Sequence, residues 1–200
     1  MSGADVVIVA SGGANIASLR FALERLGTAC EVSADGGRIR AATHVILPGV
    51  GAAADAMTRL RERRLDEVLP DLAQPVLGIC LGMQLLFEAS EEGDARCLGV
   101  IPGRATRLPD GPDRPVPHMG WNTLEAERAS PLLAGLGARP YVYFVHSYAL
   151  PVGAATLAST SYGQPFSACV GWRNFLGVQF HPERSAAVGA RLLRNFLALA

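Results

Sequence analysis

A cysteine stands between two glycines in the stretch PVLGICLGMQLLFEAS, residues 75–90. Gly78 and Gly82 flank Cys80 where an apolar run typical of a strand changes to helical spacing. A tight strand-to-helix turn presents a nucleophile at its corner, and small neighbours leave room for that turn. The positive end of the helix dipole favours a thiolate there. A buried, unreactive side chain is the better interpretation of any single cysteine, so other residues must support this hypothesis.

A second candidate group follows a late apolar run, in QFHPE at residues 179–183. Glu183 comes two residues after His181, and Pro182 stiffens the link between them. A carboxylate this close can orient an imidazole, and a cysteine nucleophile needs such a base. Taken alone, the two side chains could equally be a surface pair of little consequence. Together with Cys80 at another strand end, they indicate a site for acyl transfer.

An acyl-transfer site also needs donors for the oxyanion, and LPGVG at residues 47–51 can supply one. Gly49 and Gly51 allow the backbone to turn its amides toward a ligand. The N–H of Leu81, at the expected helix start, is the other natural donor. His44 lies at the opposite end of this run, and we expect it to pack there.

Alternating strands and helices are expected to position these residues. The patterns predict strands at 5–10, 43–51 and 74–80, followed by helices at 16–27, 55–69 and 81–90 respectively. Short runs from about 97 to 170 predict antiparallel hairpins, before a last strand at 174–183 and a helix at 186–200. The predicted fold class is α/β, a mainly parallel sheet with helices on both faces and an antiparallel hairpin extension. Sites in such folds lie beyond the carboxyl ends of the strands.

The composition limits the class of protein. The chain has 200 residues, 50% of them apolar, which predicts a single domain over 1–200. Its formal net charge is zero, and without a basic run neither nucleic acid nor an anionic membrane is indicated as a partner. No stretch approaches the ~20 apolar residues of a membrane span, so we expect a soluble, cytoplasmic protein. Four scattered cysteines without a C-x-x-C pair argue against a disulfide framework and a zinc site.

Several of these stretches together resemble a known family. GICLGMQLLF, QFHPE and LPGVG are similar to the triad-type glutamine amidotransferases, which hydrolyse glutamine to glutamate and ammonia. VPHMGWN at 116–122 and YFVHSY at 143–148 resemble, within that family, the glutaminase subunits of imidazole glycerol phosphate synthase. The resemblance implies Cys80 as nucleophile, His181 as acid and base, and Glu183 as the orienting partner of His181. It implies no cofactor and no metal.

The resemblance also implies residues that contact the substrate. The backbone amides of Val50 and Leu81 would form the oxyanion hole. The residues that would hold glutamine are Gly49, Gly51, Gln84, His146, Ser147 and Tyr148. For His146, a satisfied buried histidine is the open alternative.

A partner is expected because ammonia in neutral water becomes mostly unreactive ammonium. The resemblance implies a (β/α)8-barrel cyclase, which uses the ammonia to make imidazole glycerol phosphate in histidine biosynthesis. One alternative is a glutaminase subunit of another synthase, such as those of the anthranilate or pyridoxal phosphate pathways, and PHMGWN with YFVHSY weighs against it. Another is a cysteine peptidase on a related sheet, for which the sequence offers no peptide groove.

The chain departs from the family pattern at two places. It has ASGGAN at 10–15, where the family usually shows an acidic residue and an aromatic one, although Asn15 is kept. It has AAADAM at 52–57, where an aromatic residue is common. These departures concern local packing and partner contacts and leave the three catalytic positions unchanged.

Overall fold

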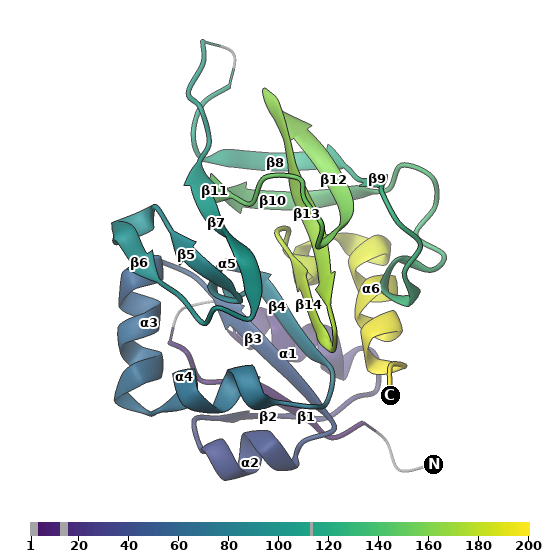
Figure 1. Cartoon of the computed structure of the whole chain (residues 1–200). Coiled ribbons are helices and arrows are strands. Elements are labelled where there is room, and N and C mark those ends of the chain that lie inside the picture. The colour runs from purple at the N-terminus through teal and green to yellow at the C-terminus, as the bar shows by residue number, and fades with distance from the viewer. Residues whose placement is uncertain (1–3, 13–15, 113) are drawn as a thin grey trace.

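A computed structural model of the protein describes residues 4–12, 16–112 and 114–200. A large sheet runs through the middle of the molecule, in the strand order β2-β1-β3-β4-β14-β13-β12-β9 (Figure 1). The first five strands in this order are parallel: β2 Cys30–Ser33, β1 Val6–Val9, β3 His44–Gly49, β4 Val76–Cys80 and β14 Phe175–Val178. The antiparallel strands β13 Gln164–Trp172, β12 Thr156–Tyr162 and β9 Glu125–Ala126 extend it. The predicted α/β class is confirmed.

Helices cover both faces of this sheet, and a hydrophobic core fills the space on each side. One face carries α2 Gly36–Ala41, α3 Ala53–Glu62, α4 Leu65–Val68 and α5 Leu81–Leu85. The other carries α1 Ile16–Glu24 and α6 Ala186–Leu197. Alternate residues of β1 enter the two cores, which is why this strand is apolar throughout.

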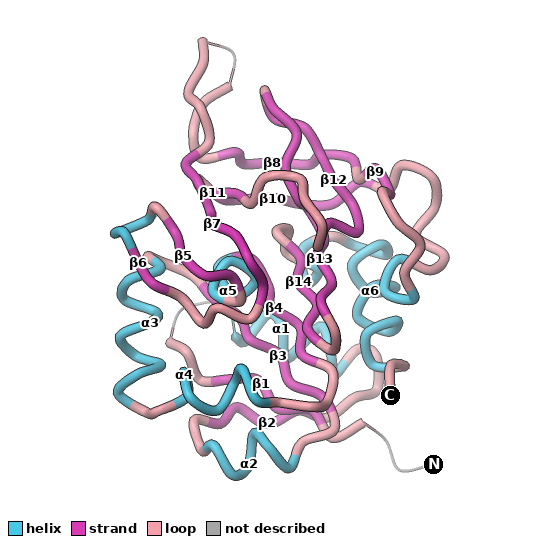
Figure 2. The backbone as a smooth tube through the Cα atoms, in the orientation of Figure 1, coloured by secondary structure: helices cyan, strands magenta, loops and turns pink. Residues whose placement is uncertain are grey.

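Two smaller sheets flank the large one (Figure 2). The first contains β11 Tyr148–Ala149, β7 Ile101–Arg107, β5 Phe87–Ser90 and β6 Ala95–Arg96. The second is the antiparallel pair of β8 His118–Thr123 and β10 Tyr141–His146. Single turns of 3-10 helix lie at η1 Leu69–Asp71, η2 Glu92–Asp94, η3 Pro131–Leu133 and η4 Pro182–Arg184. Within the described residues, no helix has the length and apolarity to cross a membrane.

The structure corrects two predicted helices and part of the hairpin region. The expected helix at 55–69 is broken, because Arg64 has a left-handed backbone with φ 54° and separates α3 from α4. The expected helix at 81–90 ends at Leu85, and Phe87–Ser90 is a strand. An apolar run this short does not distinguish a buried helix from a buried strand by its period. Within the region expected to be antiparallel, β7 pairs in parallel with β5, which lies before that region.

Candidate active site

Cys80 occupies the corner between β4 and α5. Its backbone has φ 54° and ψ −113°, outside the regions that non-glycine residues favour. Glycines make the corner possible: a Cβ on Gly82 would overlap the Leu47 carbonyl, and a Cβ on Gly78 would lie 2.7 Å from the Met83 backbone. The start of α5 therefore rests directly on the backbones of β3 and β4. Only glycine at these positions lets the turn hold the sulfur at the end of the sheet.

His181 follows β14, which is the immediate neighbour of β4 in the sheet. Its Nδ1 lies 2.9 Å from Oε1 of Glu183, and both side chains are buried. Burial alone would lower the pKa of His181, but hydrogen bonds with Cys80 and Glu183 raise this pKa above its ordinary value. The structure thus brings Cys80, His181 and Glu183 together, with an imidazole that can be protonated beside the sulfur at neutral pH.

The residues expected at the oxyanion hole lie around the same sulfur. Gly49, at the end of β3, pairs with Cys80 in the parallel register of β3 and β4. Val50 and Gly51 follow, and Gly51 has φ 87°, a conformation that L side chains rarely adopt. Leu81 is the first residue of α5. Val50, Gly51 and Leu81 line one cavity with Cys80.

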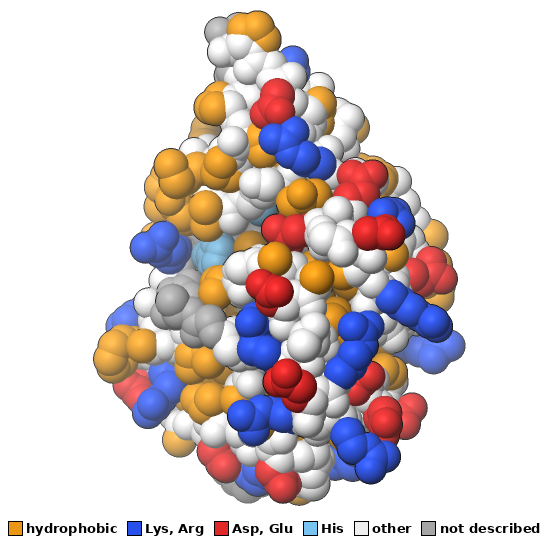
Figure 3. All heavy atoms as spheres, turned by 90° about the vertical axis from the view of Figure 1, so that its left-hand side faces the viewer, with side chains coloured by type: hydrophobic (Ala, Val, Ile, Leu, Met, Phe, Trp, Pro, Cys, Tyr) orange, Lys and Arg blue, Asp and Glu red, His pale blue; other side chains and the backbone are white. Residues whose placement is uncertain are grey.

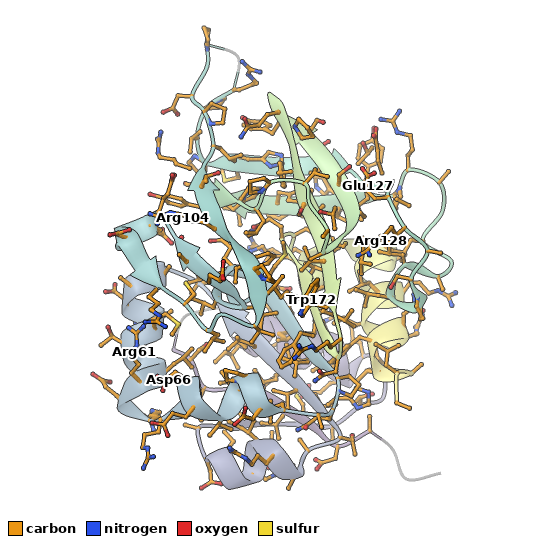
Figure 4. The ribbon with its side chains drawn as sticks, viewed as in Figure 1. Arg61, Asp66, Arg104, Glu127, Arg128 and Trp172 are labelled. Carbon is orange, nitrogen blue, oxygen red and sulfur yellow. The ribbon has the colours of Figure 1, made fainter. Side chains whose placement is uncertain are left out.

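This cavity has a volume of about 480 Å³, enough for a small polar molecule. Its wall includes four residues named from the resemblance, Gln84, His146, Ser147 and Tyr148, and His181. It also includes Glu92 and Arg184, which the sequence interpretation missed because neither falls in a motif that assigns it a role. A second hollow, of about 430 Å³, lies at the opposite end of β4, where Arg128 and Trp172 belong to its lining (Figure 4).

Buried polar side chains behind the cavity form one connected network. The carbonyl oxygen of Tyr148 accepts hydrogen bonds from Nδ1 of His146, at 2.9 Å, and from Nε2 of Gln84, also at 2.9 Å. Nε2 of His146 then accepts from Nδ1 of His118, at 3.0 Å. Both ring nitrogens of His146 have protein partners, although the ring still lines the cavity. The other hydrogen of the Gln84 amide goes to Oε1 of Gln179, at 3.0 Å.

His44 lies at the start of β3, away from the cavity, as its place in the sequence predicts. Its Nε2 lies 3.1 Å from the Leu199 carbonyl oxygen, and its ring packs edge-on against Phe196. Burial lowers the pKa of His44. This histidine fixes the end of the chain against the sheet and takes no part in the cavity.

Comparison with known proteins shows the family of this chain. The family model "Glutamine amidotransferase class-I" matches residues 11–200. The chain belongs to the class-I glutamine amidotransferases. It is 53% identical over 195 residues to "Imidazole glycerol phosphate synthase subunit HisH" of Xanthomonas axonopodis pv. citri, covering 98% of each chain. The protein of the same name from Vibrio cholerae serotype O1 is 50% identical over 201 residues, again with 98% of each chain covered.

Solved structures share the fold of this amidotransferase. The crystal structure of a glutamine amidotransferase from Thermotoga maritima superposes with a TM-score of 0.67 at 17% sequence identity. The match covers 98% of this chain and 83% of that one. At this identity the likeness concerns the fold alone.

Ser11, in the described part of the first segment that departs from the family pattern, contacts the end of β3. Ser11 Oγ donates to the Pro48 carbonyl oxygen at 2.8 Å, and Nε of Arg59 donates to the Ser11 carbonyl oxygen at 2.7 Å. Ser11 is thereby tied both to the end of β3 and to α3. Asn15 lies outside the described residues.

The buried histidine pair is expected to make this amidotransferase less stable in acid. Burial lowers the pKa of His118 to about 4, and mainly burial lowers that of His146 to about 3, from an ordinary value of 6.5. Well above pH 6.5 both rings are neutral in the folded and the unfolded chain. As the pH falls from there toward the folded values, the unfolded chain binds protons that the folded chain does not, and the free energy of unfolding decreases.

Urea unfolding of His118→Gln at several pH values tests this expectation. Between about pH 6 and about pH 4.5, the variant should lose up to roughly 1.4 kcal/mol less unfolding free energy per pH unit than the wild type. His181 adds little slope in this window, because its raised pKa keeps it protonated in the folded chain and its ordinary pKa of 6.5 keeps it mostly protonated in the unfolded chain. An unchanged slope in the variant would mean that His118 is not held neutral by the fold.

Proposed function

We propose that this protein is the glutaminase subunit of an imidazole glycerol phosphate synthase and supplies ammonia for histidine biosynthesis. The observation that carries the proposal is Cys80 on a strained corner, facing a cavity beside His181, which is itself hydrogen-bonded to Glu183. Membership of the class-I glutamine amidotransferases supports the chemistry. Relatives named imidazole glycerol phosphate synthase subunit HisH, about as long as this chain, support the pathway.

The reaction begins when the Cys80 thiolate attacks the carboxamide carbon of glutamine. Backbone N–H groups of Val50 and Leu81 stabilise the oxyanion of the tetrahedral intermediate. His181 gives its proton to the departing nitrogen, so ammonia leaves and a thioester remains on Cys80. The neutral imidazole of His181 then takes a proton from water, which attacks the thioester and releases glutamate. Glu183 keeps the imidazole oriented and stabilises its protonated form.

Charges on the cavity wall fit the two ends of a glutamine zwitterion. Glu92 provides a carboxylate that attracts the α-ammonium group, and Arg184 provides a guanidinium that attracts the α-carboxylate. Gln84 donates both hydrogens of its amide to Tyr148 and Gln179. Only its Oε1 is left for the substrate, so Gln84 acts there as an acceptor. Gly51, Ser147 and Tyr148 complete the wall that holds the substrate, and Gly49 pairs with Cys80 at its edge.

An exposed apolar face beside the cavity provides a surface for the partner. Met119, Trp121 and Tyr141, on the β8–β10 sheet, are 67%, 53% and 61% exposed. Figure 3 shows hydrophobic side chains gathered next to a histidine on one face of the molecule. Met119 pairs with Val145, and Val145 lines the cavity, so the face is continuous with the site. A (β/α)8-barrel cyclase docked on it would receive ammonia directly from the cavity.

Glutamine-dependent synthesis of imidazole glycerol phosphate, reconstituted with the cyclase, tests the function and the docking face together. Trp121→Ala should weaken the binding of the cyclase at least about thirtyfold, because it removes a large aromatic side chain from the proposed contact. Phe21→Ala is the matched control, since Phe21 is 58% exposed on α1 and lies outside this face. If both variants bound the cyclase equally well, the β8–β10 face would not be the interface. If the intact proteins made no product, the proposed function would be rejected.

A further inference from the structure

A glutamine outside the expected catalytic set faces the sulfur of Cys80. Gln179 follows the last residue of β14, and none of its surface is exposed. Its Nε2 lies 3.7 Å from Sγ of Cys80, within reach of an N–H···S hydrogen bond. The backbone N–H of Gln179 donates to the Ala168 carbonyl oxygen in β13, which fixes the main chain at this point. The side chain therefore reaches from the end of β14 toward the sulfur at the end of the neighbouring strand β4.

The orientation of the Gln179 amide follows from a fixed acceptor. The carbonyl oxygen of Tyr148 can only accept, so the amide of Gln84 must turn its NH2 group toward it. The second hydrogen of this NH2 group points to Gln179, which must therefore present its oxygen to Gln84. The NH2 group of Gln179 is then left facing the sulfur. Reversing either amide would set two oxygens or two NH2 groups against each other at 3.0 Å.

A hydrogen-bond acceptor and a hydrogen-bond donor thus both contact the sulfur of Cys80. The Val145 carbonyl oxygen, 3.8 Å away, can accept a hydrogen bond from the thiol but repels a thiolate. The NH2 group of Gln179 can only donate, and a donor favours the thiolate. The imidazolium of His181 favours it as well. The fixed amide of Gln179 therefore counters the repulsion by Val145 whenever the sulfur carries a charge.

We propose that Gln179, oriented by Gln84, is a hydrogen-bond donor that stabilises the thiolate of Cys80 in the glutaminase reaction. The inference rests on the proposed function, because it concerns the same sulfur. Gln179 forms no covalent bond and loses no proton. Its N–H donates to a charged sulfur at two steps of each turnover. The first is before the attack on glutamine, and the second is when the carbon–sulfur bond of the thioester breaks and the electron pair returns to sulfur.

Other charged and titratable groups line the same cavity as Cys80 and must be kept constant in any test. They are His181 and Arg184 after β14, His146 and Tyr148 on the β10 and β11 strands, and Glu92 in η2. A substitution at Gln179 leaves all of them in place. A change in thiolate reactivity that is shared by a variant with and a variant without the acceptor for Gln84 can then be assigned to the missing donor.

The test measures two quantities in the complex with the cyclase: glutaminase kcat and KM, and the rate of alkylation of Cys80 by iodoacetamide as a function of pH. Gln179→Met keeps the length and apolar volume of the side chain but removes the NH2 group, together with the oxygen that accepts from Gln84. At neutral pH we expect alkylation of Cys80 and kcat to fall about tenfold in this variant, with KM nearly unchanged. At high pH, where both proteins carry the thiolate, the two alkylation rates should converge.

A second variant keeps the inference testable if the first one does not fold. Gln179→Glu preserves the acceptor for Gln84 but sets an oxygen against the sulfur, so its loss of kcat and of alkylation at neutral pH should exceed that of Gln179→Met. Gln74→Glu, the same substitution at a partly buried glutamine that bonds to the Ile39 carbonyl oxygen, should alkylate Cys80 at the wild-type rate.

The possible failures are distinguishable. Wild-type kcat and alkylation in folded Gln179→Met, or an alkylation deficit that persists equally at all pH values, would overturn the role of Gln179. The proposed function would still stand if the wild-type chain hydrolyses glutamine and Cys80→Ala does not. If the wild-type chain did not hydrolyse glutamine, the proposed function itself would be rejected.

Discussion

Cys80→Ala is expected to fold, to bind the cyclase and to hydrolyse glutamine at less than roughly one thousandth of the wild-type rate. Alanine removes only the sulfur from a side chain that is 8% exposed, and it keeps the Cβ that packs in the core. Without the sulfur no thioester forms, and the oxyanion donors and His181 have no nucleophile to assist. Glutaminase kcat of the complex measures the loss. The cyclase reaction supplied with ammonium salt should remain, because it does not need this site.

The other cysteines provide controls for this prediction. Burial raises the pKa of Cys97 to about 11 and that of Cys169 further, and burial also raises the pKa of Cys30. A glutamine-mimicking electrophile should therefore label Cys80 before these three thiols, as mass spectrometry can show. Cys97→Ala, the same substitution at another buried cysteine, should keep its activity. Normal turnover in folded Cys80→Ala, or equal labelling of all four thiols, would reject the nucleophile.

The strand-to-helix corner could be predicted from the sequence because its causes are local. Gly78 and Gly82 are close to Cys80 in the chain, and both are required because a Cβ at either position would meet neighbouring backbone. The H-P-E stretch is local in the same way, since the imidazole and the carboxylate are only two residues apart. That the two groups meet depends on the pairing of β4 with β14, which are nearly 100 residues apart in the chain. From the sequence, the meeting of Cys80 with His181 was indicated only by the rule that parallel strands place their carboxyl ends at the same edge of a sheet.

Residues whose roles depend on distant neighbours were missed for a physical reason. From the sequence, Gln179 is one residue at the end of an apolar strand. Its proposed role depends on contacts with Gln84 and Cys80, which belong to another strand and helix. Glu92 enters the cavity because the chain turns into a strand after Leu85 instead of continuing as a helix. The break at Arg64 is similar, since its left-handed backbone lets Leu65 and Leu69 join Leu60 in one core. Helical spacing alone does not predict where tertiary packing ends one helix and begins the next.

His181→Asn and Glu183→Gln are both expected to reduce kcat, and the histidine change should be the more severe. Asparagine cannot carry the proton to the leaving ammonia or take one from water, which removes a contribution of about 100- to 10,000-fold. Glutamine at position 183 still fills the space beside the imidazole but removes the negative charge. Because hydrogen bonds with Cys80 and Glu183 raise the pKa of His181, losing this charge lowers that pKa and weakens the imidazolium that accompanies the thiolate.

The size of the difference between these two variants tests the assigned roles. The loss of kcat in Glu183→Gln should be roughly tenfold to a hundredfold smaller than in His181→Asn, because the carboxylate acts through the ring while the ring acts on the substrate. His44→Asn is the matched control: this buried histidine bonds to the Leu199 carbonyl oxygen at the other end of β3, and its loss should leave the kcat of the folded protein unchanged. The measurement is glutaminase kcat and KM of the three variants in complex with the cyclase. If His181→Asn and Glu183→Gln kept normal kcat and raised only KM, the pair would bind glutamine without moving its protons, and the mechanism would need another acid and base.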